Sequence, residues 1–217
     1  MGESGESPQS RGRVVADAVV VAAGHSSRMD GVDKVDALLG GRPLLAWSLD
    51  AIAAAPEVER IVVVLDERRA WDASRAWPTW FPAKVIAAVA GGRERQLSVA
   101  AGLRALDEAS RGNGGARSSE IVLIHDGARP LVSTALVSAV AQAAAARGAA
   151  LPILPIVDTV KHVDGDAEGA EVGATVDRSG LATAQTPQGI RRELLARAYA
   201  AFPPDAPPAF TDEAALL

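Results

Sequence analysis

Cysteine is absent from the 217-residue sequence, which excludes disulfide bonds and thiolate metal sites. No uncharged apolar run approaches the roughly 18 residues that a transmembrane helix needs, so no membrane partner is expected. Residues 1–13 lack the apolar stretch of a signal peptide, and we expect them to form a disordered tail. These absences favour a cytoplasmic protein.

A strongly basic charge is absent as well. The formal net charge is −5, which argues against a nucleic-acid partner but leaves room for a local basic pocket that binds a small anion.

The length fits a single domain, which we place at 14–217 and which is large enough to bury a sizeable core. Hydrophobic residues make up 48% of the chain, and much of this share is alanine, valine and leucine. This composition is typical of an α/β protein.

Apolar runs alternate with amphipathic segments along the chain. The runs are nearly continuous stretches of apolar residues rather than alternating ones, which predicts strands that are buried on both faces. We expect a doubly wound, mostly parallel, Rossmann-like sheet with ligands at the carboxyl ends of its strands. Ser133 and Gly148 should begin and end the fourth helix. The predicted strands are 17–23, 60–66, 84–90, 120–126 and, at an edge or with an irregular start, 150–156; the predicted helices are 43–55, 67–76, 95–109 and 132–148.

The segment 157–186 differs from the rest, because short β-like pieces alternate there with glycine and aspartate turns. This pattern predicts a β-hairpin arm that projects from the sheet. Residues 107–119 are expected to form a flexible loop, and the proline-rich stretch 203–208 an extended connector. Three tryptophans near Phe81 are expected in the core or at an interface, since no basic stripe accompanies them.

The first candidate site is the loop after the first strand, in "AVVVAAGHSSRMDGVDK". Its small residues, among them Gly24 and Gly31, would let backbone N–H groups approach an oxyanion closely. Arg28 and Lys34 add two cations suited to phosphate. The loop is neither the dinucleotide fingerprint nor the P-loop. The alternative is an ordinary strand-to-helix turn with two solvated cations.

The second candidate is "IHDGARP", where Asp126 ends a strand. A carboxylate at the rim of the sheet could hold the Mg²⁺ that polyphosphates need, and Arg129 could bind an anion. The alternative role for Asp126 is that of a cap on the following turn. For His125 we favour a packed or hydrogen-bonded core histidine.

Two further sets of residues stay open to two interpretations. Gly91 and Gly92 follow a strand and open a helix, so their backbone amides could form hydrogen bonds to the edge of a nucleotide base, with Ser98 facing back toward them from one turn into the helix. The alternative is a plain strand-to-helix turn. Polar groups in the arm suit phosphate or sugar hydroxyls, although spacing alone indicates a solvated hairpin. They are Thr159, Lys161, Arg178 and Thr186.

These motifs, in this order, resemble the 2-C-methyl-D-erythritol 4-phosphate cytidylyltransferase family from Ala18 to Leu217. "AAGHSSRM" is shared by nucleotidylyltransferases in general, whereas "HDGARP" followed by "DTVK", "TVDR" and "QTPQ" is more specific. The resemblance implies cytidylyl transfer from CTP to a sugar-alcohol phosphate with Mg²⁺ at Asp126, in a homodimer whose arms complete each other's sites. It assigns nucleotide binding to Ala22, Ala23, Gly24, Gly92 and Ser98, catalysis to Arg28, Lys34 and Arg178, and substrate binding to Asp126, Arg129, Thr159 and Thr186.

Two alternatives accompany this resemblance: a molybdopterin or sugar nucleotidylyltransferase, and a truncated, non-catalytic nucleotide-binding relative. We expect "FTDEAALL" to begin a helix, with Thr211 as its cap and with Asp212 and Glu213 in its first turn. The family continues past this motif with a strand that carries a lysine. We therefore expect a truncated form of a longer enzyme, which binds CTP but turns over poorly.

Overall fold

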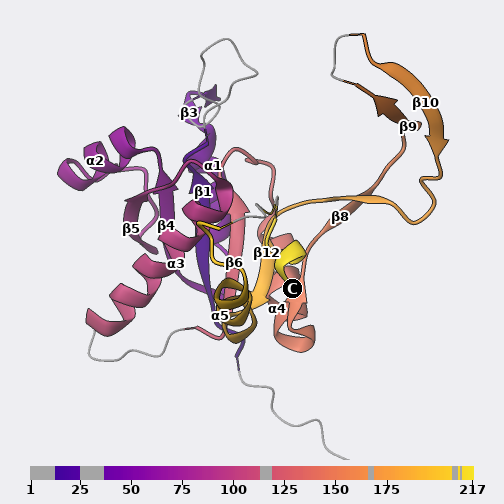
Figure 1. Ribbon diagram of the computed structural model, residues 1–217. Helices are drawn as coiled ribbons and strands as arrows, with labels where there is room; N and C mark the ends of the chain where they lie inside the picture. The colour runs from indigo at the N-terminus through magenta and orange to yellow at the C-terminus, as the bar shows by residue number, and fades with distance from the viewer. Residues whose placement is uncertain (1–12, 25–36, 113–118, 166–168, 207–209, 211) are drawn as a thin grey trace, which may run out of the picture.

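The computed structural model describes residues 13–24, 37–112, 119–165, 169–206, 210 and 212–217, around a six-stranded β-sheet (Figure 1). In spatial order the strands are β5 (Val85–Ala90), β4 (Val58–Leu65), β1 (Ala16–Ala22), β6 (Ile121–Asp126), β12 (Gln188–Arg191) and β7 (Ala149–Ala150). The first four run parallel to one another, whereas β12 is antiparallel to both of its neighbours. The mostly parallel α/β sheet is thereby confirmed.

Helices pack on both faces of this sheet. One face carries α1 (Leu44–Ala53), α2 (Glu67–Arg75) and α4 (Thr134–Arg147); the other carries α3 (Arg95–Gly112) and α5 (Arg192–Ala201). Side chains along β1 alternate between the hydrophobic cores on the two faces of the sheet. Ala18 and Val20 pack in the core beneath α1, α2 and α4, and Val19 packs in the core beneath α3 and α5. Among the described residues, none of the helices combines the length and the apolar character that crossing a bilayer requires.

The predicted ends of α4 are confirmed. The Oγ of Ser133 accepts a hydrogen bond from the backbone N–H of Leu136 at 3.2 Å, which satisfies one of the unpaired donors of the first turn. Gly148 adopts a φ of 96°, in the region that favours glycine after a helix.

Two strand predictions need correction. Residues 84–90 form the edge strand β5, in which Ile86 is 39% exposed, rather than a strand buried on both faces. The predicted strand 150–156 is divided between β7 and β8 (Ile153–Pro155), which lies outside the main sheet. Pro152 between them has no N–H with which to continue the ladder to β12.

The flexible loop predicted at 107–119 is wrong in its first half, because α3 continues to Gly112. Leu106 and Ser110 keep a buried face at helical spacing, and the Ser110 hydroxyl donates to the carbonyl of Leu106 at 2.9 Å. The end of the chain forms a short 3₁₀ helix, η1 (Ala214–Leu216), in which Asp212 Oδ1 accepts from the N–H of Ala215. Thr211, the expected cap, lies outside the described residues.

The predicted arm projects from the sheet as two antiparallel pairs (Figure 1). The outer pair is β9 (Val160–Asp164) with β10 (Glu171–Val176), and the inner pair is β8 with β11 (Ala182–Ala184). The paired region therefore begins at Ile153, earlier than the predicted start at residue 157. Before α1, β2 (Leu38–Leu39) and β3 (Arg42–Pro43) form a small antiparallel hairpin.

A buried ion cluster lies at the amino end of β1. Asp17 is fully buried, and its carboxylate accepts from Arg60 Nε at 2.9 Å and Nη2 at 2.6 Å, from Arg192 Nη2 at 2.7 Å and from Ser119 Oγ at 3.0 Å. These partners come from β4, α5 and the segment before β6. The cluster therefore joins three parts of the chain at the edge opposite the carboxyl ends of the strands.

Candidate active site

Small residues gather where the carboxyl ends of β1, β5 and β6 meet. A Cβ atom on Gly91 would lie 2.5 Å from Ala23 Cβ and 2.6 Å from Ser98 Oγ. A Cβ atom on Gly127 would lie 3.1 Å from the Cβ atom of Ala22. Glycine is therefore required at position 91 and closely packed at position 127, and the predicted residues Ala22, Ala23 and Ser98 are brought together at one edge of the sheet.

The turn at Gly92 is held by the side chain of Ser98. The Ser98 hydroxyl accepts from the N–H of Gly92 at 3.1 Å and donates to the carbonyl of Glu94 at 3.2 Å. Ser98 itself is 2% exposed, so its hydroxyl fixes the turn, as its predicted position one turn into the helix suggested. Gly24 lies exposed just after β1. Arg28 and Lys34 lie outside the described residues.

Asp126, at the end of β6, lies between two guanidinium groups. Its Oδ1 accepts from Arg95 Nε and Nη2, both at 3.3 Å, and its Oδ2 accepts from Arg129 Nε at 3.0 Å. The side chain is 31% exposed. Arg129 also donates to the side-chain carbonyl of Gln185 at the base of the arm. The predicted pair of Asp126 and Arg129 is therefore in direct contact.

His125 is a buried core histidine, as predicted. Its Nε2 lies 3.3 Å from the carbonyl of Arg129 and its Nδ1 lies 3.0 Å from Thr186 Oγ1. Burial lowers the pKa of His125 to about 4, so the ring is neutral near pH 7. Because a carbonyl can only accept, Nε2 carries the proton and Nδ1 accepts from the Thr186 hydroxyl. The oxygen of Thr186 in turn accepts from the N–H of Asp126 at 3.3 Å, which brings this predicted residue to the site.

Two charged residues of this site were missed by sequence reasoning. Arg95, in the first turn of α3, forms an ion pair with Glu213 and contacts Asp126. Glu213, expected in the first turn of a helix, directly precedes the short helix η1 and is 1% exposed. Burial raises the pKa of Glu213, and the charge of Arg95 opposes that shift. Residues 95 and 213 lie far apart in the sequence, so no local pattern could have paired them.

Thr159 and Arg178 are not brought to this cluster by any contact among the described residues. Both are exposed in the arm, which leads away from the sheet (Figure 1). The guanidinium of Arg178 donates to the carbonyl of Val157, within the arm. One copy of the chain thus gathers Asp126, Arg129 and Thr186 but holds Thr159 and the predicted catalytic residue Arg178 apart from them.

Asp126 offers a single carboxylate to a metal ion. Within the described part of the chain, no group of three or more His, Asp or Glu side chains is arranged to hold a metal. Mg²⁺ commonly binds through one or two carboxylates together with substrate phosphates and water. The residues present therefore fit a metal that arrives with a polyphosphate rather than one held by the protein alone.

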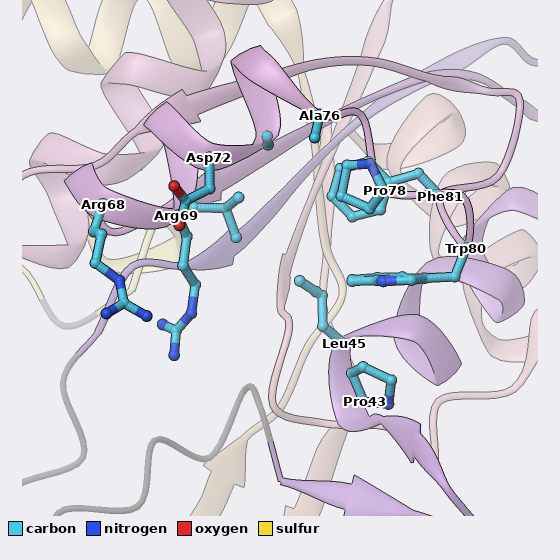
Figure 2. Close-up of a pocket in the computed structure, with 11 residues that line it drawn as sticks. Pro43, Leu45, Arg68, Arg69, Asp72, Ala76, Pro78, Trp80 and Phe81 are labelled. Atoms are coloured by element: carbon cyan, nitrogen blue, oxygen red, sulfur yellow. The ribbon is translucent and has the colours of Figure 1, made fainter.

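A separate cavity of about 310 Å³ lies beside α2 (Figure 2). Trp80 and Phe81 form one wall, and their rings meet edge-on with centroids 4.6 Å apart. Phe81 belongs to the core, in agreement with the prediction for this aromatic cluster. Trp71 and Trp77 lie outside the core, since they are 61% and 47% exposed, and Trp71 lies against Arg75.

A doubly wound sheet with glycine turns and a carboxylate at its carboxyl edge is typical of nucleotide-binding α/β proteins. Residues 16–217 match the sequence model of one family of such proteins, 2-C-methyl-D-erythritol 4-phosphate cytidylyltransferase. The chain belongs to this family of nucleotidyltransferases, which confirms the resemblance.

Individual relatives agree with this assignment. The chain is 39% identical over 182 residues to the 2-C-methyl-D-erythritol 4-phosphate cytidylyltransferase of Dehalococcoides mccartyi strain 195, covering 84% of this chain and 74% of the relative. It is 44% identical over 201 residues to the bifunctional enzyme IspD/IspF of Anaeromyxobacter dehalogenans, covering 91% of this chain and 48% of the relative. The chain thus spans about half the length of the bifunctional relatives that it matches.

Solved structures are similar over most of the chain. The 2-C-methyl-D-erythritol 4-phosphate cytidylyltransferase of Thermus thermophilus aligns with a TM-score of 0.63 at 34% identity, covering 94% of this chain and 82% of that one. The 4-diphosphocytidyl-2C-methyl-D-erythritol synthase of Anaerococcus prevotii aligns with a TM-score of 0.73 at 27% identity, covering 94% and 81%.

Proposed function

We propose that the chain transfers the cytidylyl group of CTP to 2-C-methyl-D-erythritol 4-phosphate and releases pyrophosphate, a step of isoprenoid precursor synthesis by the non-mevalonate route. The observation that carries this proposal is the family match, which spans the glycine loop, "HDGARP" and the arm motifs in one chain. A molybdopterin or sugar nucleotidylyltransferase would not be expected to combine these motifs. A cytoplasmic location remains part of the proposal.

In the proposed reaction, an oxygen of the acceptor phosphate bonds to the α-phosphorus of CTP. The bond from that phosphorus to the β-phosphate oxygen breaks, and pyrophosphate leaves with the electron pair. No protein nucleophile is needed, so catalysis consists of positioning and electrostatic stabilisation. Arg28 and Lys34 would neutralise the triphosphate. Backbone groups of the turn that Ser98 fixes, together with the small residues after β1, would bind the nucleotide.

Asp126 is the residue that would hold Mg²⁺. The metal would neutralise phosphate charge and orient the triphosphate. Arg129 contacts the second oxygen of Asp126 and is tied through Gln185 to the base of the arm. It would therefore keep the carboxylate oriented while the acceptor phosphate binds beside it.

Replacing Asp126 with asparagine should weaken the binding of Mg²⁺–CTP roughly tenfold, because the amide oxygen carries no charge for the metal. Binding of CTP without Mg²⁺ should change little, and the fold should be retained, since the amide can still accept from Arg129. Calorimetry with and without Mg²⁺ measures both quantities. Unchanged affinity for Mg²⁺–CTP would remove Asp126 from the metal site.

The arm supports a homodimer as part of the proposal. Val163 and Val172 on the outer hairpin are 54% and 70% exposed, and Ile153 and Leu154 on the inner pair are also exposed. A two-stranded hairpin is marginal in water on its own. A second copy of the chain would cover these apolar side chains. It would also receive Thr159 and Arg178, which lie away from the Asp126 cluster of their own copy.

Replacing Val172 with aspartate should shift the chain toward monomer in sedimentation velocity at micromolar concentration. A charge in a packed apolar contact is strongly unfavourable. The matched control is Ile86→Asp on the edge strand β5, which is an exposed apolar position outside the arm. Equal sedimentation of the two variants and the unsubstituted chain would contradict the role of the arm in pairing.

The proposed activity is tested by pyrophosphate release from CTP with 2-C-methyl-D-erythritol 4-phosphate as the acceptor. UTP and GTP replace CTP in parallel reactions, and other phosphorylated acceptors replace the sugar-alcohol phosphate. We expect release to require both CTP and this acceptor. Faster release with another nucleotide or acceptor would favour a different nucleotidyl transfer.

A further inference from the structure

Glu213 lies in a short chain of charges that leads to Asp126. Its carboxylate pairs with Arg95 Nη1, and the Nε and Nη2 atoms of the same guanidinium each lie 3.3 Å from Asp126 Oδ1. One arginine of α3 therefore bridges two carboxylates, one at the end of β6 and one just before η1. Side-chain exposure is 2% for Glu213 and 23% for Arg95, so water screens this pair only weakly.

The backbone at Glu213 is fixed independently of its carboxylate. The side-chain carbonyl of Gln188, on β12, accepts from the N–H of Glu213 at 3.1 Å and from the N–H of Ala214 at 3.3 Å. Gln188 is itself 2% exposed. The carboxylate of Glu213 thus stands on a rigid support, and it can fix the position of a more mobile partner such as an arginine side chain.

The contact between Arg95 and Asp126 is loose by comparison. A charge-assisted N–H···O bond usually measures about 2.7–2.9 Å, whereas both of these measure 3.3 Å. Arg129 approaches the other oxygen of Asp126 to 3.0 Å. Asp126 would be a poor ligand for a cation if Arg95 and Arg129 both formed close ion pairs with its carboxylate. Glu213 pairs with Nη1 of Arg95, and the remaining nitrogens of that guanidinium make only the two longer contacts with Asp126.

We infer that Glu213 is a positioning residue for nucleotide binding: by holding Arg95 back, it keeps the carboxylate of Asp126 available to a Mg²⁺–nucleotide. This inference rests on the proposed function. In the absence of the Glu213 charge, Arg95 would close on Asp126 and compete with the metal ion.

The test compares Glu213→Gln with the unsubstituted chain in calorimetric titrations with CTP, once with Mg²⁺ and once with a chelator. Glutamine keeps the size and an accepting oxygen but removes the charge. We expect the affinity for Mg²⁺–CTP to fall roughly tenfold, as for other residues that support a metal ligand, while the affinity for metal-free CTP is unchanged. The matched control is Glu57→Gln. Glu57 is also buried and hydrogen-bonded, to Ser138 and Gln142, but lies near the amino end of β1, and its substitution should leave both affinities unchanged.

Two results would overturn the inference. An unchanged affinity of Glu213→Gln for Mg²⁺–CTP would show that Glu213 has no influence on the metal ligand. An equal loss with and without Mg²⁺, together with a lowered melting temperature, would show that Glu213 is only structural. If the glutamine variant does not fold, Glu213→Asp keeps the charge on a shorter side chain, and a smaller loss confined to the Mg²⁺ titration would support the inference. Failure of the unsubstituted chain to bind CTP would overturn the proposed function and this inference together.

Discussion

Lys34→Ala should lower kcat for cytidylyl transfer at least about a hundredfold, the loss expected when a major electrostatic stabiliser of the transition state is removed. Lys34 itself lies outside the described residues, and its role is the one that the family resemblance assigns, a cation on the triphosphate of CTP. The described chain before it runs through Ala22 and Ala23, which lie against Gly127 and Gly91 at the proposed nucleotide site. A cation on the triphosphate stabilises the charge that develops on the leaving pyrophosphate, so its loss should have a large effect.

Two further substitutions make this prediction specific. Lys84→Ala removes the same charge from the segment before β5, where the ammonium donates to the carbonyl of Ala55 at 3.0 Å, and should leave kcat nearly unchanged. Lys34→Arg keeps the charge on a differently shaped group and should recover part of the lost rate. Steady-state rates of pyrophosphate release measure all three variants. Near-normal turnover of Lys34→Ala would exclude Lys34 from the mechanism.

The fold could be predicted wherever local sequence and tertiary environment agree. The strands β1, β4 and β6 are apolar over most of their length because helices cover both faces, with polar or charged residues only toward their ends, and that pattern is visible in the sequence. The edge strand β5 carries the same pattern although it is partly exposed, so its position in the sheet could not be inferred. The short strand β12, "QGIR", has no strand signal of its own and is recognised only through its pairing with β6 and β7.

Some residues of the candidate site could likewise be predicted from the sequence, and others could not. Asp126 could be predicted because a carboxylate at the end of an apolar run must lie at the rim of the sheet, and His125 because it lies within that run. Arg95 and Glu213 could not, since 118 positions separate them and neither is unusual in its own segment. Thr159 and Arg178 were assigned by resemblance alone. Their place in the arm suggests that their assigned role needs a second copy of the chain.

The buried cluster around Asp17 leads to the largest expected effect on stability. Asp17→Asn should lower the free energy of unfolding by about 3–5 kcal/mol, because it removes the charge of the buried carboxylate that Arg60 and Arg192 share. Arg60 then loses its carboxylate partner, and Arg192 keeps only the half-exposed Asp107, at 2.8 Å. The two arginine side chains are only 18% and 19% exposed, so water compensates poorly for the lost charge. Urea unfolding followed by far-ultraviolet circular dichroism measures this loss.

Asp50→Asn is the matched control, because it makes the same chemical change to another aspartate–arginine pair. The Asp50 carboxylate accepts from Arg42 Nη2 at 2.7 Å, as Asp17 does from Arg192, but its side chain is 45% exposed. The control should lose at most about 1 kcal/mol, the usual value for a surface pair. Equal losses in the two variants would contradict the view that burial makes the Asp17 cluster important.

Below its melting temperature the Asp17 variant should still bind Mg²⁺–CTP normally, because the cluster lies at the amino end of β1 and the proposed site at the carboxyl end. A loss of both stability and nucleotide binding would show that the two edges of the sheet are coupled.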